Sequence, residues 1–559
     1  MLHLILCWHF HQPDYRDERG EYFLPWVYLH ALKDYSDMAA HLEAVPGMRA
    51  VVNFVPTLLE QLDDYGDQFQ TGRLRDPLLS WLIEPRLEAL HREERLALLQ
   101  DCFRVHVPTM LDPFPAYARL HALWKMVEAS GGAGAEYLSG QFLADLVTWY
   151  HLAWTGESLR REQPLILQLI EKGGGFTLDE RQALFRLIGA VVGGLIPRYR
   201  ALADAGRIEL SATPHSHPMA PLLVDLAAAR QAQPGLTLPR AHRYPGGALR
   251  VATHVQAAQA CHQAHFGRQA AGFWPAEGGV SALVLDLLEH AGLAWYASGE
   301  GVLRHSLAAK GYDPGPRADW LSQPYRLDGQ SLVGFFRDDH LSDLIGFEYK
   351  NWHSGEAVRH FLHALEESHR AAAETDPVVT VVLDGENAWE FYPYNGWYFL
   401  SELYQALASH PRLRLTTFSD YLAGHPNAAG VLPTLVAGSW VYGDFSTWIG
   451  EPAKNRAWDL LCAAKAEYDR VTAAGTLDAA AAAAAEAQLK SCESSDWFWW
   501  FGDHNPGDSV QAFDRIYRAK LRTLYGLLGV LAPAELDVPL SRGGGDAEAG
   551  GVMRRGGTG

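Results

Sequence analysis

Two carboxyl groups stand in settings that suit chemistry. Glu277 lies within Gly272–Gly279, a segment rich in glycine, proline and tryptophan, and Asp384 ends the apolar run Val378–Leu383. An apolar run that stops at a carboxylate predicts a buried strand with that group at its C-terminal end. A single Asp or Glu is more commonly a solvated surface charge or a helix cap. Two loop carboxyl groups beside aromatic rings instead favour cleavage of a glycosidic bond, with one as nucleophile and the other as acid/base.

Histidines follow two further candidate strands, in His9–Pro13 and in Thr213–Pro218. His and Gln side chains at strand ends can hydrogen-bond sugar hydroxyls. The repeated His-x-His pattern also resembles metal-ligand spacing, with Asp338-Asp339-His340 as the best source of a third ligand. No tight cluster of Asp and His completes a site along the sequence. We therefore expect no metal ion, and we interpret Asp338 as a polar contact to substrate.

An aromatic segment, Ser494-Ser-Asp-Trp-Phe-Trp-Trp-Phe-Gly502, comes from a region of helical pattern. Tryptophan faces can stack on pyranose rings, but buried tryptophans also contribute a large apolar area to a core. Three rings so close in sequence do not all face one cleft, so we expect about two of them to be core. A further acidic residue, Glu386, is expected to hydrogen-bond a neighbour rather than to act on substrate.

Short apolar runs alternate with longer amphipathic stretches over the first 420 or so residues, which predicts a parallel sheet closed as a barrel. About seven strands are expected, at Leu2–Cys7, Ala50–Phe54, Ile208–Ala212, Gly272–Trp274, Ala294–Ala297, Leu332–Arg337 and Val378–Leu383. Helices are expected between them, at Ala89–Arg104, Leu178–Leu202, Ala248–His265, Ser281–Ala291 and Gly355–Glu374.

The chain divides into three parts by its patterning. Residues 1–424 are expected to form the barrel domain, with a helical insertion at about 58–174. Residues 425–540 are expected to be helical, at Pro452–Tyr468, in the alanine-rich Ala479–Lys490 and at Gln511–Leu528, because alanine is the strongest helix former. The glycine-rich segment 541–559 predicts a disordered tail.

Composition limits the partners. The net charge of −19 argues against nucleic acid and anionic membrane surfaces as partners.

The five cysteines are widely spaced without a CxxC pair, which fits a reducing compartment. The apolar N-terminus lacks a basic segment and predicts a first strand rather than a signal peptide, and no run of about 18 apolar residues predicts a membrane span. A cytoplasmic protein is expected; nothing indicates an oligomeric state.

Taken in the order in which they occur along the chain, the five segments resemble the motifs of glycoside hydrolase family 57, over roughly residues 1–530. His11-Gln12-Pro13 is similar to the first motif, and His217 stands at the histidine of the second. Phe273–Glu277 matches the third motif, which carries the nucleophile, and Leu383–Glu386 the fourth, which carries the acid/base. The fifth, an aspartate with a following tryptophan, looks like Asp496 with Trp499 or Trp500.

The resemblance implies an incomplete (β/α)7 barrel, a C-terminal helical domain that completes the cleft, a retaining mechanism and no required metal or other cofactor. It implies Glu277 as nucleophile and Asp384 as acid/base. The residues expected to bind substrate are His11, Gln12, His217, Trp274, Asp338, Trp389, Asp496, Trp499 and Trp500. The motifs look closest to α-amylase- and amylopullulanase-like bacterial members.

Four functions compete. The first is hydrolysis of α-1,4 and α-1,6 bonds in α-glucans such as glycogen, starch and maltodextrins. The second is transfer through the same intermediate, as in a 4-α-glucanotransferase or a branching enzyme. The third is a metal-dependent deacetylase or mannosidase that uses the histidines as ligands. The fourth, a glucan-binding protein without catalysis, is disfavoured because both Glu277 and Asp384 are present.

Overall fold

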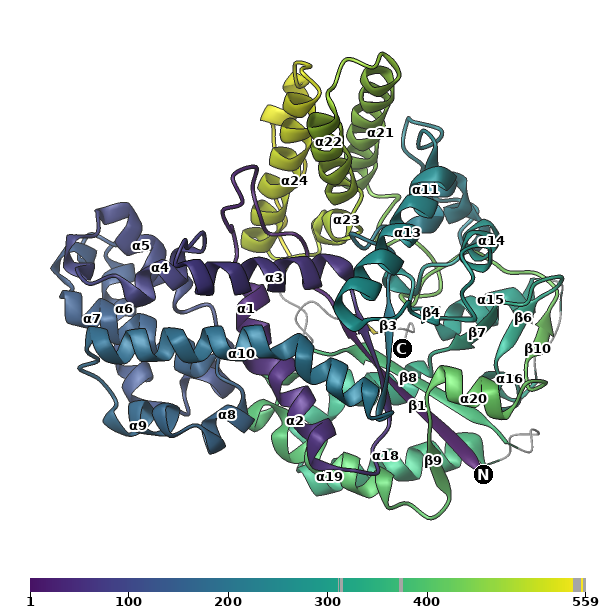
Figure 1. Cartoon of the computed structure of the whole chain (residues 1–559), viewed down its shortest axis with the longest axis horizontal. Coiled ribbons are helices and arrows are strands. Elements are labelled where there is room, and N and C mark those ends of the chain that lie inside the picture. The colour runs from purple at the N-terminus through teal and green to yellow at the C-terminus, as the bar shows by residue number, and fades with distance from the viewer. Residues whose placement is uncertain (310, 312–314, 371–375, 546–553, 556–559) are drawn as a thin grey trace.

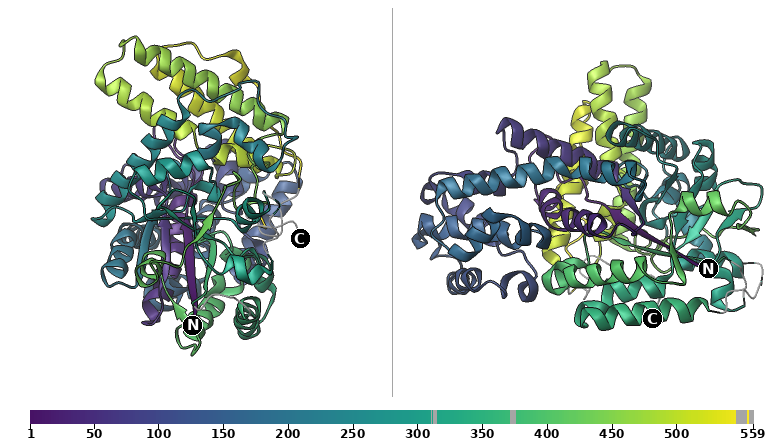
Figure 2. Two further views of the ribbon diagram at one scale, coloured as in Figure 1. Left: turned by 90° about the vertical axis from the view of Figure 1, so that its right-hand side faces the viewer. Right: turned by 60° about the horizontal axis from the view of Figure 1, so that its bottom comes forward.

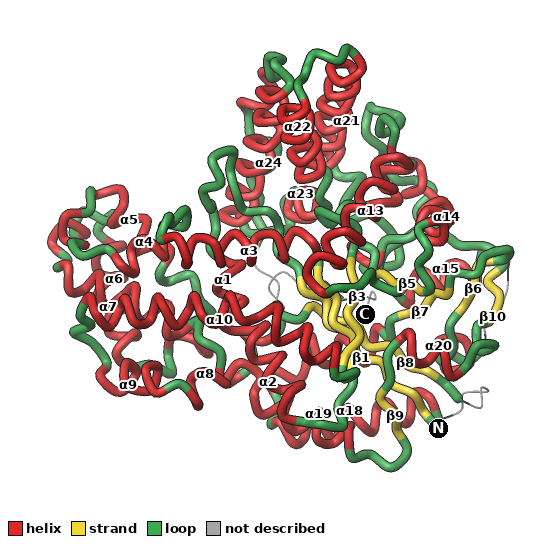
Figure 3. Tube along the Cα trace, viewed as in Figure 1, coloured by secondary structure: helices red, strands yellow, loops and turns green. Residues whose placement is uncertain are grey.

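Seven parallel strands form the centre of the protein (Figure 3). The computed structural model describes residues 1–309, 311, 315–370, 376–545 and 554–555. The seven strands are β1 (Leu2–Phe10), β2 (Ala50–Phe54), β3 (Ile208–Ala212), β4 (Gly272–Phe273), β5 (Trp295–Ser298), β7 (Val333–Phe336) and β8 (Val378–Asp384). Their hydrogen-bonded order is β7-β5-β4-β3-β2-β1-β8, and one parallel bridge between Arg337 and Thr380 links the two ends of this arc. The predicted incomplete (β/α)7 barrel is confirmed.

The central strands are apolar along their whole length because both of their faces are covered. β1 is buried at every residue except Leu2, and β8 at every residue except Asp384. Near-continuous apolar sequence of this kind is typical of parallel strands packed between layers. Asp384, the last residue of β8, is half-buried, and its carboxyl group lies at the C-terminal end of the barrel.

Three short strands were missed by the sequence patterns. β6 (Tyr325–Leu327) pairs antiparallel with β7, β10 (Gly430–Leu432) pairs with β6, and β9 (Leu413–Leu415) pairs with the first residues of β1. Each has three residues, too few for an alternating or continuous apolar pattern to emerge. β10 lies beyond residue 424, so the sheet continues past the domain boundary expected from sequence.

Between β2 and β3 the described chain forms helices and loops only. Most of these helices project away from the barrel (Figure 1), in line with the helical insertion proposed from sequence. They are α3 (Pro56–Thr71), α4 (Pro77–Ile83), α5 (Arg92–Asp101), α6 (Pro115–Ala129), α7 (Gly140–Ala153), α8 (Glu157–Glu162), α9 (Pro164–Lys172) and α10 (Leu178–Asp204).

The remaining helices before residue 425 surround the sheet. They are α1 (Trp26–His30), α2 (Ser36–Ala44), α11 (Ala220–Val224), α12 (Ala229–Ala232), α13 (Gly247–Phe266), α14 (Ala282–His290), α15 (Glu300–Ala308), α16 (Arg317–Leu321), α17 (Asp339–Asp343), α18 (Ser354–His369), α19 (Trp397–Ala408) and α20 (Phe418–Gly424). The end of the helix expected at Gly355–Glu374 falls on residues 371–374, outside the described part.

Four C-terminal helices gather at one end of the molecule, at the top of Figure 1 and of the left view of Figure 2. They are α21 (Pro452–Ala473), α22 (Ala479–Cys492), α23 (Asp496–Trp500) and α24 (Gly507–Leu527). Most of the expected tail, 546–553 and 556–559, lies outside the described residues. Within the described part, Ser541 is buried and its hydroxyl accepts from the backbone of Gly502.

Two expectations from composition can be compared with the structure. All five cysteines have free thiols. Among the described residues, none of the helices combines the length and the apolar character that crossing a bilayer requires.

Candidate active site

Glu277 lies just past β4, in a single 3-10 turn, Ala276–Gly278. Its backbone has φ 60° and ψ 21°, in the left-handed region that residues other than glycine seldom adopt. Ser216 and His217, in the loop after β3, also have positive φ. Such strain persists only where the surroundings hold it, and it concentrates at functional sites. The backbone therefore supports a functional role for both loops.

The Glu277 carboxyl group is buried between two polar neighbours. Ser495 Oγ lies 2.9 Å from Oε1, and Trp440 Nε1 donates to Oε2 at 3.2 Å. Burial raises the pKa of Glu277 to about 8, and the negative charges of Asp496 and Asp384 act in the same direction. The bonds from Ser495 and Trp440 act against this rise by favouring the carboxylate. Glu277 therefore holds a proton readily near neutral pH.

Asp384 ends β8 and is paired in register with His9 of β1. The Gly385 N–H donates to the His9 carbonyl at 2.8 Å, and a Cβ at Gly385 would overlap the ring of Phe10. Glycine thus lets the end of β8 approach β1. Burial raises the pKa of Asp384, and the bond that Asn387 Nδ2 donates at 2.9 Å offsets part of the rise. A buried carboxyl group with a raised pKa can serve as an acid.

A chain of hydrogen bonds joins β1 to Glu277. His9 Nδ1 lies 2.7 Å from Asn53 Oδ1, which can only accept, so His9 donates there and its Nε2 accepts. His217 Nε2, 3.2 Å from His9 Nε2, must then donate. Burial lowers the pKa of His9 to about 3 and that of His217 well below its ordinary value, so both rings are neutral. The remaining nitrogen of His217, Nδ1, therefore accepts from Ser495 Oγ at 2.9 Å.

This chain has two proton arrangements. With His217 neutral, the one hydroxyl hydrogen of Ser495 is used in the hydrogen bond to His217 Nδ1. The contact between Ser495 and Glu277 then needs a protonated Glu277 as donor. When Glu277 ionises, the Ser495 hydroxyl can turn to donate to the carboxylate, and His217 Nδ1 then loses its donor. This Ser495 relay couples the protonation of Glu277 to the hydrogen bond that His217 receives.

The C-terminal helices supply part of this site. Ser494 forms an antiparallel bridge with Pro218, and the Ser495 N–H donates to the His217 carbonyl at 2.8 Å. These backbone contacts fix Ser495 beside the loop after β3, although the two segments are far apart in sequence. The segment after α22 therefore completes the surroundings of Glu277.

Asp496 and His11 form a second contact between the two parts of the chain. His11 Nε2 lies 2.9 Å from Asp496 Oδ1, and the His11 ring stacks on His217 with ring centroids 3.8 Å apart. Glu386 Oε1 accepts from the His11 N–H and from Gln12 Nε2, both at 3.3 Å. Burial raises the pKa of Glu386 well above its ordinary value. A protonated Glu386 that holds the His11–Gln12 segment fits the neighbour-bonding role expected for it.

His11, His217 and Asp496 each offer a ligand atom, and these atoms lie within 4.8 Å of one another. The expectation that no Asp–His cluster forms is wrong, because Asp496 arrives from the C-terminal helices. Both ring nitrogens of His217 are already hydrogen-bonded, to His9 and to Ser495, so a metal ion would displace one of these bonds. Hydrogen bonding alone accounts for the cluster.

The sequence profile described as glycosyl hydrolase family 57 matches residues 5–433, which contain Glu277 and Asp384. The chain belongs to glycosyl hydrolase family 57. Membership makes it an enzyme of the glycoside hydrolase class and confirms the family that the sequence resembles. A comparison with curated proteins finds no match.

Solved structures of other proteins share the fold. The branching enzyme TK1436 of Thermococcus kodakaraensis is 16% identical, with a TM-score of 0.55 over 94% of this chain and 90% of that chain. The α-amylase AmyC of Thermotoga maritima is 13% identical, with a TM-score of 0.56 over 94% and 92%. The 4-α-glucanotransferase of Thermococcus litoralis is 14% identical, with a TM-score of 0.50 over 94% and 59%. At these identities the likeness concerns the fold.

Two family-57 residues expected to bind substrate are buried in other roles. Trp389 is 1% exposed, packs against Trp8 and Tyr392, and donates from Nε1 to the Gly385 carbonyl. These neighbours leave its faces no room for a sugar ring, so it supports the end of β8 from within the core. Asp338 is 0% exposed, caps α17 and pairs with Arg317, which corrects its expected contact with substrate.

The other aromatic candidates divide between core and surface. Trp274 is fully buried, with its ring edge-on to Trp440. Trp497 is also fully buried, whereas Trp499 and Trp500 keep some exposed surface. One of the three clustered tryptophans, rather than about two, is therefore completely enclosed. Trp499 and Trp500 remain candidates for stacking on substrate.

Two neighbours of Glu277 were missed by sequence reasoning. Ser495 lies inside the aromatic segment Ser494–Gly502, but a serine next to Asp496 does not by itself indicate a functional role. Trp440 belongs to the aromatic stretch Ser439–Trp448, and its contact with Glu277 arises only when the loop after β10 folds over the barrel. Its backbone N–H also donates to the Glu277 carbonyl at 2.9 Å.

A cavity of about 500 Å³ lies between α3 and the C-terminal helices. His11 and Asp496 line it, together with His215, Ser216 and Lys490 on α22. A larger cavity of about 1070 Å³ lies between α5, α6 and α24. Glu277 and Asp384 line neither cavity, but the smaller one is lined by His11 and Asp496 of the candidate site.

Proposed function

We propose that this protein cleaves α-glucans with retention of anomeric configuration, with Glu277 as nucleophile and Asp384 as acid/base. The observation that carries the proposal is the placement of both carboxyl groups, Glu277 buried and Asp384 half-buried, at the C-terminal ends of β4 and β8. Catalytic groups of parallel barrels lie at this face. The charge of Asp384 contributes to the raised pKa of Glu277, which supports their proximity.

In the first step, Asp384 gives its proton to the glycosidic oxygen while a Glu277 oxygen bonds to the anomeric carbon. The bond between that carbon and the leaving oxygen breaks, and a covalent glycosyl-enzyme forms. In the second step, Asp384 takes a proton from the incoming hydroxyl group, whose oxygen displaces Glu277. The carboxyl proton and the carboxylate are restored at the end of the cycle.

The Ser495 relay supports Glu277 as nucleophile despite its raised pKa. A nucleophile must be ionised, and Ser495 and Trp440 can both donate to the Glu277 carboxylate once its proton has left. The residues proposed to contact the sugar are His11, Gln12, His217, Asp496, Trp499 and Trp500. Trp274 is fully buried, so we propose that it supports the site instead of contacting the sugar.

Hydrolysis is our first proposal for the second step, and transfer to a sugar hydroxyl is the alternative. The similar solved structures include an α-amylase, a branching enzyme and a 4-α-glucanotransferase by name, so α-glucans are the proposed substrate class and both outcomes use one intermediate. The partition depends on how well the acceptor side of the cleft excludes water.

A product assay separates these outcomes. Maltoheptaose, glycogen and pullulan are incubated with the enzyme and with Glu277→Gln as a matched inactive control, and products are separated by chain length. Only shorter chains support hydrolysis, chains longer than the substrate support a glucanotransferase, and new α-1,6 branches support a branching enzyme. No reaction on any α-glucan would refute the proposed substrate class.

A further inference from the structure

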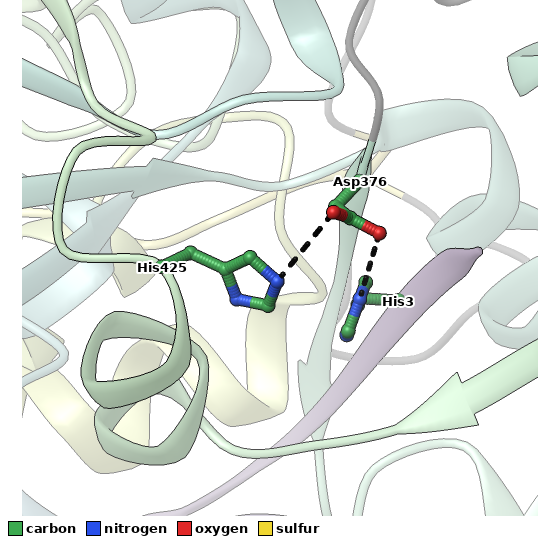
Figure 4. A group of neighbouring side chains, drawn as sticks. All are labelled: His3, Asp376 and His425. Carbon is green, nitrogen blue, oxygen red and sulfur yellow. Dashed lines mark ion pairs between the residues drawn. The ribbon is translucent and has the colours of Figure 1, made fainter.

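Two histidines and an aspartate converge at the opposite end of β1 from the candidate active site. His3 is the second residue of β1, Asp376 immediately precedes Pro377 and β8, and His425 follows the last residue of α20 (Figure 4). Each offers one ligand atom, and these atoms lie within 4.8 Å of one another. Three segments distant in sequence thus present two imidazoles and a carboxylate to one point.

The orientation of His425 favours a ligand. His425 Nδ1 lies 3.0 Å from the Tyr421 carbonyl, which can only accept, so the ring proton is on Nδ1. Nε2 then carries a lone pair, and it lies 3.9 Å from Asp376 Oδ2. An imidazole whose other nitrogen donates to a backbone carbonyl is the usual arrangement of a metal-bound histidine.

His3 faces the same carboxylate from the other side. Its Nε2 lies 3.9 Å from Asp376 Oδ1, its side chain is 5% exposed, and its Nδ1 has no hydrogen-bond partner among the described residues. Its ring packs edge-on against both Tyr421 and His425. His3 is thereby fixed in place, whereas the Asp376 side chain is 46% exposed and can adjust.

We propose that His3, Asp376 and His425 bind a divalent transition-metal ion of the zinc type. Two imidazoles with one carboxylate suit such ions, whereas Mg²⁺ and Ca²⁺ prefer oxygen ligands. Ligands bound tetrahedrally at about 2.0–2.1 Å lie about 3.4 Å apart. Since the three donor atoms lie within 4.8 Å of one another, each pair needs to close in by about 1.4 Å at most. Three protein ligands leave one position for water. The α-amino group of Met1, 3.3 Å from Asp376 Oδ1, shares this carboxylate and must yield to the ion.

The role of the ion is structural. It joins the start of β1, the start of β8 and the end of α20 at the N-terminal face of the barrel, where side chains serve stability and not chemistry. An ion that binds only the folded chain stabilises it by mass action. The proposal goes beyond the proposed function, does not depend on it, and differs from the expectation that the protein binds no metal.

The test compares zinc binding between variants of the full chain. Protein stripped with a chelator is titrated with ZnCl₂ by calorimetry, and the melting temperature is measured with and without Zn²⁺. Asp376→Asn and His425→Gln remove a ligand at partly exposed positions that tolerate substitution. His410→Gln is the matched control, because His410 pairs with Glu366 at 3.3 Å without belonging to the cluster.

We expect the wild type and His410→Gln to bind one more equivalent of Zn²⁺ than Asp376→Asn and His425→Gln, with a rise in melting temperature that both ligand variants lose. Because the comparison is a difference between variants, any ion bound by His11, His217 and Asp496 cancels. MgCl₂ should give no such difference. Equal stoichiometry and equal thermal shifts in all four proteins would overturn the proposal.

Discussion

Glu277 and Asp384 belong to one coupled system, and this governs chemistry at the scale of single residues. Burial raises the pKa of both groups, and the negative charges of Asp496 and Asp384 raise the pKa of Glu277 further. Coupled groups lose their protons in macroscopic steps that belong to the pair. The roles of the two carboxyl groups therefore follow from their neighbours, because Glu277 has the relay and Asp384 does not.

The coupling predicts a shift in the pH dependence of Asp384→Asn. A neutral amide no longer contributes negative charge, so Glu277 loses its proton more easily. In the reaction with an activated glycosyl substrate, whose leaving group needs no acid, the limb where activity rises as Glu277 ionises should move to lower pH than in the wild type. The pH–rate profiles of the two proteins give the comparison, and a limb that stays in place would show that the groups are not coupled.

The relay predicts a specific loss in Ser495→Ala. Without the hydroxyl group, the Glu277 carboxylate loses a hydrogen-bond donor. We expect kcat to fall about 10²- to 10³-fold, as when one donor to a catalytic charge is removed, and the limb that reports ionisation of Glu277 to move to higher pH. Ser495→Thr keeps the hydroxyl group and should restore both values. An alanine variant with wild-type kcat and pH profile would exclude the relay.

Sequence reasoning at this scale found the residues that end strands and missed those that reach the site through tertiary folding. His11, Glu277 and Asp384 follow apolar runs, so their positions could be predicted. Ser495 and Trp440 contact Glu277 only because segments distant in sequence fold onto the barrel. The same limit explains Trp389, whose place beside Asp384 in sequence concealed that it faces the core.

At the scale of elements, Glu493 fastens the C-terminal helices to the barrel. It is fully buried at the start of the segment that carries Ser495, and it accepts from Arg250 and His254 of α13. Burial alone would raise the pKa of Glu493, but His254 and Arg250 lower it to about 2 from 4.5. This ion pair thus determines whether α23 sits correctly over the loop after β3.

The lowered pKa predicts how stability depends on pH. A carboxyl group with a depressed folded-state pKa stabilises the fold above its unfolded value of 4.5, and this contribution is lost as pH falls toward 2. Its size is about 3 kcal/mol at about 1.4 kcal/mol per pKa unit. Glu493→Gln should therefore unfold at lower denaturant concentration at pH 7, and its difference from the wild type should shrink between pH 4.5 and 2. A difference that does not change with pH would contradict this account.

Element prediction succeeded where the pattern was long. All seven expected strands of the barrel are present; β2 and β3 have the expected bounds and the others shift by one to three residues, because buried β-branched runs such as β8 leave few alternatives. The helices α10, α13 and α22 were likewise placed to within three residues. The three-residue strands β6, β9 and β10 form only because neighbouring strands offer unpaired edges, which a local pattern does not contain.

At the scale of the whole molecule, the two parts of the chain form one active site. The barrel supplies Glu277, Asp384 and His217, and the C-terminal region supplies Ser495 and Asp496. We propose that the boundary between them lies after β10, at about residue 433, because β10 still pairs with the sheet. The C-terminal helices are on this view a wall of the cleft rather than a separable module.

This shared site predicts a single cooperative unit. A chain that ends at residue 433 lacks Ser495, Asp496 and Trp440, and it leaves Arg250 and His254 of α13 without the buried carboxylate of Glu493. We expect it to lose activity on maltodextrins, and we expect the full chain to unfold in one calorimetric transition. Two resolved transitions, with activity retained after the first, would refute the shared site.

The most direct test of the central claim is to trap the covalent intermediate. A slow fluorinated α-glucosyl fluoride is incubated with the enzyme, the protein is digested, and the labelled peptide is sequenced by mass spectrometry. The proposed mechanism predicts one glucosyl unit attached to the Glu277 side chain, and no label in Glu277→Gln. A label on Asp384, or release of a product with inverted anomeric configuration and no labelled peptide, would contradict it.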